Sequence, residues 1–170
     1  MARLFFALWP GEDQTGALGA LALRLAAETD GRPVPVEKIH MTLAFLGAVA
    51  DEARPAALAA ASNLRATAFE LVLDHAGAFR RAGVAWAGTS SPPAELLRLQ
   101  ARLAGRLRVA GFELEDRAFA PHVTLARRTV RAIARRPIEP VAWTARRFTL
   151  VRSETGTGRY VIEKEWALRE

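Results

Sequence analysis

The chain has 170 residues, 51% of them hydrophobic, which is enough for one sizeable core, so we expect a single domain over residues 1–170. The absence of cysteine excludes disulfides, thiolate catalysis and cysteine-based zinc sites. The net charge of +6 favours a polyanionic partner only weakly, because nearly all of the cations are Arg in an Ala-rich chain and composition bias alone produces such a charge.

The chain shows no signal for a membrane span or for export. No apolar stretch approaches the roughly 18 residues that a span needs, and the first apolar run is short and has no small-residue cleavage site. We therefore expect a soluble, cytoplasmic protein. Since no pattern indicates a partner surface, we expect a monomer.

The first quarter of the chain alternates between strand and helix signals. Residues 3–10 are a short apolar and aromatic run, typical of a buried strand. Residues 13–31 carry apolar positions at helical spacing and predict a helix. Two prolines in residues 32–38 predict an extended linker that leads into a strand over residues 39–47.

The middle of the chain predicts two helices around a hairpin. Residues 51–66 are typical of a helix, and residues 69–79 and 83–89 alternate as two paired strands do. Residues 94–111 predict a long helix. Its predicted apolar face consists of Leu96, Leu97, Leu99, Leu103 and Leu107.

The last third is predicted to be mostly extended. Residues 112–128 are typical of an extended segment and residues 129–143 of a loop-rich one. Residues 146–154 and 159–169 predict two strands, joined by the hairpin loop "TGTG" at 155–158.

The order of these elements repeats. A helix, an extended entry and a strand with the pattern H-x-T-L occur over residues 13–43 and again over residues 94–125. A strand with the pattern F-x-L-V follows each copy. A repeated order of elements at weak sequence identity is typical of fused repeats, so we expect two lobes that face one another.

The two motif strands carry the candidate chemistry. They read "IHMTLAFLG" over residues 39–47 and "PHVTLARR" over residues 121–128. Residues i and i+2 of a strand project from one face, so each histidine shares a face with the threonine that follows it. The four residues are His40, Thr42, His122 and Thr124.

An imidazole beside a hydroxyl is a useful pair at a phosphate. The imidazole holds or takes a proton near neutral pH, and the hydroxyl donates to a phosphoryl oxygen. In-line displacement at phosphorus puts the attacking and leaving oxygens on opposite sides, so two such pairs supply both a base and an acid without a metal.

A lone histidine in a strand is more often a hydrogen-bonded core residue. The same spacing at two of only three histidines makes coincidence a poor explanation.

The chain resembles a known family over essentially its whole length. "HMTLAFLG" and "HVTLARR", behind "RLFFAL" and ahead of "RYVIEKEWAL", are similar to the RNA 2',3'-cyclic phosphodiesterases, or 2'-5' RNA ligases, of the 2H phosphoesterase superfamily. The resemblance implies a bilobal, duplicated α+β fold with two antiparallel sheets facing a central cleft and helices packed outside. It also implies metal-independent hydrolysis of an RNA 2',3'-cyclic phosphate to a 2'-phosphomonoester without a cofactor, with reversible 2'-5' ligation as a further reaction.

The resemblance assigns roles residue by residue. His40 corresponds to the proton donor to the departing 3'-oxygen and His122 to the proton acceptor that activates water. Thr42 and Thr124 correspond to phosphate-binding residues. The reverse assignment of the two histidines is chemically equivalent by symmetry.

The family also places an aromatic residue and an arginine five positions after the two histidines. Phe45 and Arg127 match these positions, as a base-stacking and a phosphate contact. Strict strand alternation sends both to the face opposite the histidines, so a bulge or a strand end is expected at each motif.

Other candidate sites carry less weight. Asp74 and His75 suggest a metal site, but no short ligand spacing supports it. The G-x-G of residues 154–160 opens no helix and fits a hairpin loop better than a nucleotide fingerprint. An arginine cluster after the second motif is more often a solvated face than an RNA contact, and it comprises Arg127, Arg128, Arg131, Arg135 and Arg136.

Two other functions remain open from the sequence. One is a non-catalytic protein that binds RNA ends or nucleotides. The other keeps the chemistry but acts on a small cyclic nucleotide.

Overall fold

The computed structural model describes residues 2–170. Its helices are α1 (Glu12–Thr29), α2 (Arg54–Ala61) and α3 (Ala94–Val109). Its strands are β1 (Ala2–Leu8), β2 (Arg32–Pro33), β3 (Met41–Val49), β4 (Phe69–Phe79), β5 (Val84–Gly88), β6 (His122–Arg127), β7 (Arg136–Ala145), β8 (Arg147–Ser153) and β9 (Tyr160–Ala167). Short 3₁₀ turns are η1 (Val36–Lys38), η2 (Asp51–Ala53) and η3 (Arg80–Ala82).

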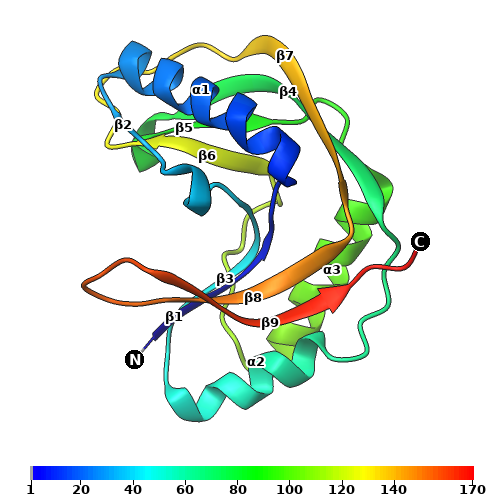
Figure 1. Ribbon diagram of the computed structural model, residues 1–170. Helices are drawn as coiled ribbons and strands as arrows, with labels where there is room; N and C mark the ends of the chain where they lie inside the picture. Colours follow the sequence, from blue (N-terminus) through cyan, green and yellow to red (C-terminus); the bar gives the residue numbers. More distant parts are fainter. Residues whose placement is uncertain (1) are drawn as a thin grey trace.

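The strands form one sheet, in the order β7-β4-β5-β6-β3-β1-β8-β9, with β2 paired to β6. The named strand pairs are antiparallel. The predicted α+β class is confirmed. The two separate sheets are not, because the single residue pair Met41–Val123 joins β3 to β6 and makes the two halves continuous. Figure 1 shows the halves above and below this junction, with the sheet curved between them.

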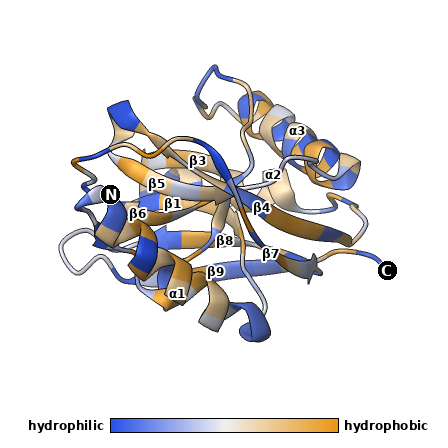
Figure 2. Cartoon of the chain, turned by 90° about the horizontal axis from the view of Figure 1, so that it is seen from above, coloured by the Kyte–Doolittle hydropathy of each residue, from blue (hydrophilic) through white to orange (hydrophobic). Residues whose placement is uncertain are grey.

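Each half of the sheet is covered by a helix that follows, along the chain, a strand of the other half. Helix α1 follows β1, yet it packs on β6 and β7 of the opposite half. Helix α3 follows β5, yet it packs on β3, where the Gln100 side chain donates a hydrogen bond to the carbonyl of Leu43 at 3.2 Å. One hydrophobic cluster of buried side chains therefore includes residues of both halves. Figure 2 shows hydrophobic segments, in orange, on strands and helices of both halves.

Helix α3 shows how the spacing of apolar residues selects the buried face. Leu96, Leu99, Leu103 and Leu107 are fully buried at steps of three and four residues, which follow one stripe of an α-helix. Leu97 was predicted to share this face and is instead 42% exposed. One position after Leu96 lies about 100° around the helix, outside the stripe.

Strand β7 corrects the prediction of a loop-rich segment over residues 129–143. It runs antiparallel to β4 at the end of the sheet. Pro137 and Pro140, which made the segment look irregular, are tolerated there because an edge strand does not need every N–H for pairing. The register also shifts between Leu73 and His75 of β4, opposite the part of β7 that contains the prolines.

No helix among the described residues 2–170 is both long and apolar enough to cross a membrane. The cytoplasmic location, the monomeric state and the single domain over 1–170 stay predictions.

Candidate active site

Strands β3 and β6 bring the two H-x-T motifs side by side. Met41 and Val123 are direct antiparallel partners, and both side chains are fully buried. This register sets His40 opposite Thr124 and sets Thr42 opposite His122. All four side chains project from the face opposite the buried pair.

The arrangement is a small two-fold array centred on the Met41–Val123 pair. Directly opposed residues of antiparallel strands lie about 4.5–5.5 Å apart, and diagonal neighbours about 7–8 Å apart. His40 and His122 are such a diagonal pair. One phosphate between them is therefore within reach of both imidazoles and both hydroxyls.

The same backbone contact fixes the tautomer of each histidine. His40 Nδ1 donates to the carbonyl of Lys38, and His122 Nδ1 donates to the carbonyl of Ala120, each at 2.7 Å. A carbonyl only accepts, so the hydrogen of a neutral ring is on Nδ1 and the lone pair is on Nε2. His40 Nε2 accepts a hydrogen bond from the Thr42 hydroxyl at 3.1 Å. In both rings Nε2 is the atom left for proton transfer.

Burial keeps both imidazoles neutral in the free protein. The pKa of His40 is lowered to about 4, chiefly by desolvation and to a smaller extent by interaction with Arg127 and His122, against the opposing effect of the hydrogen bond to the Lys38 carbonyl. Desolvation also lowers the pKa of His122 from its ordinary 6.5, with Arg117 and Arg127 contributing. An anion bound between the rings reverses the sign of the local charge and raises both pKa values.

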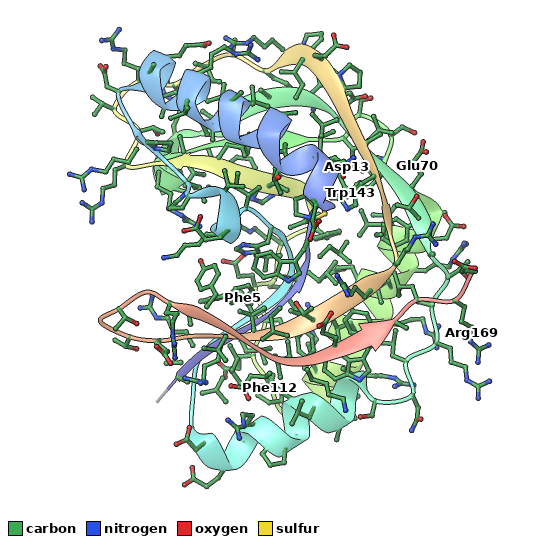
Figure 3. The ribbon with its side chains drawn as sticks, in the orientation of Figure 1. Phe5, Asp13, Glu70, Phe112, Trp143 and Arg169 are labelled. Atoms are coloured by element: carbon green, nitrogen blue, oxygen red, sulfur yellow. The ribbon has the colours of Figure 1, made fainter. Side chains whose placement is uncertain are left out.

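Aromatic side chains surround His40. Phe5 stacks on its ring with centroids 4.8 Å apart, and Trp9 and Tyr160 lie at 5.3 and 5.6 Å. Figure 3 shows Phe5 between the upper and lower halves of the sheet. Trp9 is held in turn by a 2.8 Å hydrogen bond from its indole N–H to the Thr149 hydroxyl. These contacts fix the ring and exclude water from it.

A second aromatic group supports His122. Phe79 lies edge-to-face against this ring at 5.1 Å and packs on Trp86 at 5.3 Å. Trp86 covers two glycines: a Cβ on Gly77 would meet its indole at 2.5 Å, and a Cβ on Gly88 would meet it at 3.1 Å. Gly77 therefore has no room for a side chain beneath the indole, and the fit at Gly88 is tight.

A bulge in β3 turns Phe45 onto the histidine face. Thr42 pairs with Ala7 and Phe45 pairs with Phe5, so three residues of β3 span two residues of β1. Phe45 therefore shares a face with Thr42, and its side chain is 49% exposed. The expected bulge is present.

A matching bulge in β6 does the same for Arg127. Thr124 pairs with Trp86 and Arg127 pairs with Val84, so three steps on β6 match two on β5. Arg127 therefore lies on the same face as Thr124. The structure thus brings the six predicted site residues to one face around the β3–β6 junction.

Asp74 and His75 form a separate structural cluster. The Asp74 carboxylate accepts hydrogen bonds from His75 Nδ1 at 2.9 Å, from the Ser90 N–H at 2.8 Å and from the Ser90 hydroxyl. The His75 contact, followed by Ser90, lowers the Asp74 pKa to about 2. The cluster ties the loop before α3 to β4. Within residues 2–170, no group of three or more His, Asp or Glu side chains is placed to hold a metal ion.

Sequence reasoning missed the aromatic groups around the histidines. Phe5, Trp9 and Tyr160 lie on β1, just after it and on β9, far from the first motif along the chain. An apolar strand run gives no sign of which alternate residues face a site until its partner strand is known. The aromatic content of residues 3–10 was the available signal.

A family model for the 2'-5' RNA ligase superfamily matches residues 13–157. The chain is 36% identical to the RNA 2',3'-cyclic phosphodiesterase of Escherichia coli strain K12, with 99% of this chain and 97% of that protein covered. It is 33% identical to the RNA 2',3'-cyclic phosphodiesterase of Thermus thermophilus, over 89% and 82% of the two chains.

Solved structures agree with these relatives. The structure of Escherichia coli LigT complexed with 3'-AMP superposes with a TM-score of 0.83 at 33% identity and covers 99% of both chains. A structure from Thermus thermophilus gives the same TM-score at 30% identity, with 98% of both chains covered.

Proposed function

Since the chain belongs to the 2'-5' RNA ligase superfamily, we infer that it is a phosphodiesterase that opens the 2',3'-cyclic phosphate at the end of an RNA strand. The observation that carries the reaction mechanism is the placement of both H-x-T motifs on one face of adjacent strands. Both imidazoles present Nε2 to this face, so one ring as a neutral base and the other as a protonated acid supply the two proton transfers that the reaction needs.

We propose that His122 is the base and His40 the acid. Nε2 of His122 takes a proton from water, the water oxygen attacks phosphorus, and the bond from phosphorus to the 3'-oxygen breaks. Nε2 of protonated His40 gives its proton to the departing 3'-oxygen. The products are a 2'-phosphomonoester and a free 3'-hydroxyl.

We propose that the remaining four residues bind the substrate. Thr42 and Thr124 flank the imidazoles and donate to the equatorial phosphoryl oxygens, where charge accumulates. The Arg127 guanidinium supports the same phosphate from the β6 bulge. The half-exposed ring of Phe45 offers a surface on which the terminal base stacks.

The same groups support ligation when a 5'-hydroxyl takes the place of water. His122 then activates that hydroxyl, His40 again protonates the 3'-oxygen, and the product is a 2'-5' linkage. The description of the matched family as 2'-5' RNA ligases favours this second reaction.

The reaction is tested with an oligoribonucleotide that ends in a 2',3'-cyclic phosphate, incubated in EDTA. We expect turnover in the chelator and a 2'-phosphate as the only product, identified by chromatography against both isomers. His75→Ala is the matched control for the alanine variants of His40 and His122. This third histidine lies outside the site, so the variant is expected to keep wild-type turnover. Absence of turnover, a 3'-phosphate product or loss of activity in EDTA contradicts the proposal. Binding of the cyclic-phosphate end without turnover would identify a non-catalytic RNA-end protein instead.

The roles of the two histidines are separated by a substrate whose 3'-bridging oxygen is replaced by sulfur. A thiolate leaves without a proton, so this substrate does not need the acid. We expect it to restore turnover to His40→Ala and not to His122→Ala. Rescue of His122→Ala alone would reverse the two roles.

A further inference from the structure

A cavity of about 500 Å³ opens beside His40. Three segments line it: residues 32–38 with β2 and η1, the end of β6, and the hairpin between β8 and β9. In Figure 1 these segments lie on the left side of the view, with β2 and the end of β6 above the β8–β9 hairpin. Tyr160 connects the cavity to the active site, because it lines the cavity and its ring packs edge-on against His40 at 5.6 Å.

The cavity is lined by four cations and by no acid: Arg32, Lys38, Arg127 and Arg128. Within residues 2–170 none of them forms an ion pair. A cavity of about 590 Å³ elsewhere on the chain differs in this respect. Its cations Arg54 and Arg152 contact Glu163 at 3.2 and 2.6 Å. The cations of that second cavity are thus paired with a carboxylate, whereas the cations of the cavity beside His40 are unpaired.

The unpaired cations are held close together at a local energetic cost. Arg32 and Arg127 are direct partners in the β2–β6 pair, and like charges directly opposite one another destabilise a sheet. Arg128 has φ +54°, a left-handed backbone that a non-glycine residue rarely adopts. The Lys38 ammonium lies over the Tyr160 ring, 5.4 Å from its centroid. A bound anion relieves the charge repulsion that the free protein carries.

We propose that this cavity binds the phosphodiester that joins the terminal nucleotide of the substrate to its 5' neighbour. The inference rests on the proposed function and adds to it a second binding contact, on the strand upstream of the terminal nucleotide. Guanidinium groups donate paired hydrogen bonds to phosphate oxygens, and contacts to the backbone position a strand without reading its bases. A mononucleotide lacks this phosphodiester and leaves the cavity unused.

The test compares two substrates, a 2',3'-cyclic mononucleotide and a tetranucleotide that ends in the same cyclic nucleotide. For the wild-type protein we expect kcat/KM to be at least about tenfold higher for the tetranucleotide. Turnover of both substrates with equal kcat/KM overturns this inference and leaves the proposed function intact. Turnover of neither overturns the proposed function.

The variant Arg32→Gln/Arg128→Asn removes two cavity cations that lie outside the catalytic groups, and Asn suits the left-handed backbone at residue 128. We expect it to lose the preference for the tetranucleotide and to keep kcat/KM for the mononucleotide within about twofold. The matched control is Arg24→Gln/Arg108→Gln, which removes the same charge from exposed positions on α1 and α3. It is expected to keep the preference.

Salt dependence gives a second readout. One additional phosphate contact steepens the fall of log(kcat/KM) with log[salt] by about 0.7 for a single strand. We expect this difference between tetranucleotide and mononucleotide in the wild-type protein and the control, and its loss in Arg32→Gln/Arg128→Asn. An unchanged preference and slope in that variant overturns the assignment of the cavity, as does an equal loss in the control.

Discussion

At the scale of single residues, the site depends on two imidazoles with the same hydrogen-bond pattern. Each donates Nδ1–H to the carbonyl two residues earlier, so Nε2 is presented to the shared face in both cases. The two H-x-T motifs therefore form a site with two-fold symmetry, although the sequences around them are only weakly similar. It also explains why the histidines are neutral at rest, because burial opposes their charged form.

The lowered pKa values predict an acidic optimum for kcat/KM, which reports on the free enzyme. The acid must carry a proton, and a group with a pKa below 6.5 loses it as pH rises, so kcat/KM falls by up to tenfold per pH unit above about 6.5. The base must be neutral, so kcat/KM also falls at the acidic end and the profile is bell-shaped. A kcat/KM maximum above pH 7 would contradict the lowering of both histidine pKa values by burial.

The profile for kcat is expected at higher pH than the profile for kcat/KM. The bound phosphate is an anion beside both rings and favours their charged forms, which raises both pKa values in the complex. Initial rates at saturating and at low substrate, measured from pH 4 to 9, give both profiles in one series. Coincident profiles would mean that the anion does not lie between the two imidazoles.

The sequence predicted the histidines and threonines through their spacing, but not the residues that tune them. The i, i+2 rule is local and needs no knowledge of the fold. The contacts of Phe5 with His40 and of Phe79 with His122 join different strands, so they follow from the sheet order rather than from any local pattern.

At the scale of elements, two bulges decide which residues join the site. Each inserts one residue into a motif strand, and without them Phe45 and Arg127 would point away from Thr42 and Thr124. The sequence indicated that an irregularity was needed, because five residues separate each of these side chains from its histidine. It did not indicate where the bulge lies, since that depends on pairing with β1 and β5.

Replacement of glycine by alanine is expected to have opposite effects on stability at two positions. Gly77→Ala places a Cβ 2.5 Å from the Trp86 indole, so we expect a loss of about 1–3 kcal/mol in the free energy of unfolding. Displacement of Trp86 also disturbs Phe79 and His122, so kcat/KM should fall. The control Gly105→Ala lies in the exposed interior of α3 with no atom near the new Cβ, and we expect a gain of about 0.5–1 kcal/mol. Urea denaturation of the two variants measures both changes, and destabilisation of similar size in both would contradict this account.

Strand β7 shows why element prediction failed in one place. Two prolines and a cluster of arginines gave residues 129–143 the composition of a loop, while the edge position that tolerates them is a property of the complete sheet. The α3 helix was predicted within two residues of its bounds because its repeat is long and regular.

At the scale of the whole molecule, the duplicated halves are interlaced rather than separate. Each half takes its covering helix from the other, and the β3–β6 pair makes the sheet continuous. The sequence indicated the duplication through the repeated order of elements. It did not indicate the exchange of helices. A helix that packs on its own half and a helix that packs on the other half have the same position in the order of elements along the chain.

Interlacing predicts a single cooperative unfolding transition. Unfolding of one half uncovers the hydrophobic face of the other, so neither half is expected to persist alone. Urea transitions followed by far-ultraviolet circular dichroism and by tryptophan fluorescence should coincide, and amides of β4 and β8 should exchange with similar opening free energies. Two separate transitions would show that the halves are independent folding units.

The central claim is that His40 and His122 act on one phosphorus atom, and a double-mutant cycle on kcat/KM for a cyclic-phosphate-ended tetranucleotide tests it most directly. His40→Ala and His122→Ala are each expected to lower kcat/KM by about a hundredfold or more. The double variant should lose little more than the worse single variant, because the two residues serve one displacement and act as a unit. A double variant whose loss equals the product of the two single losses, or a single variant with near-wild-type kcat/KM, would contradict the claim.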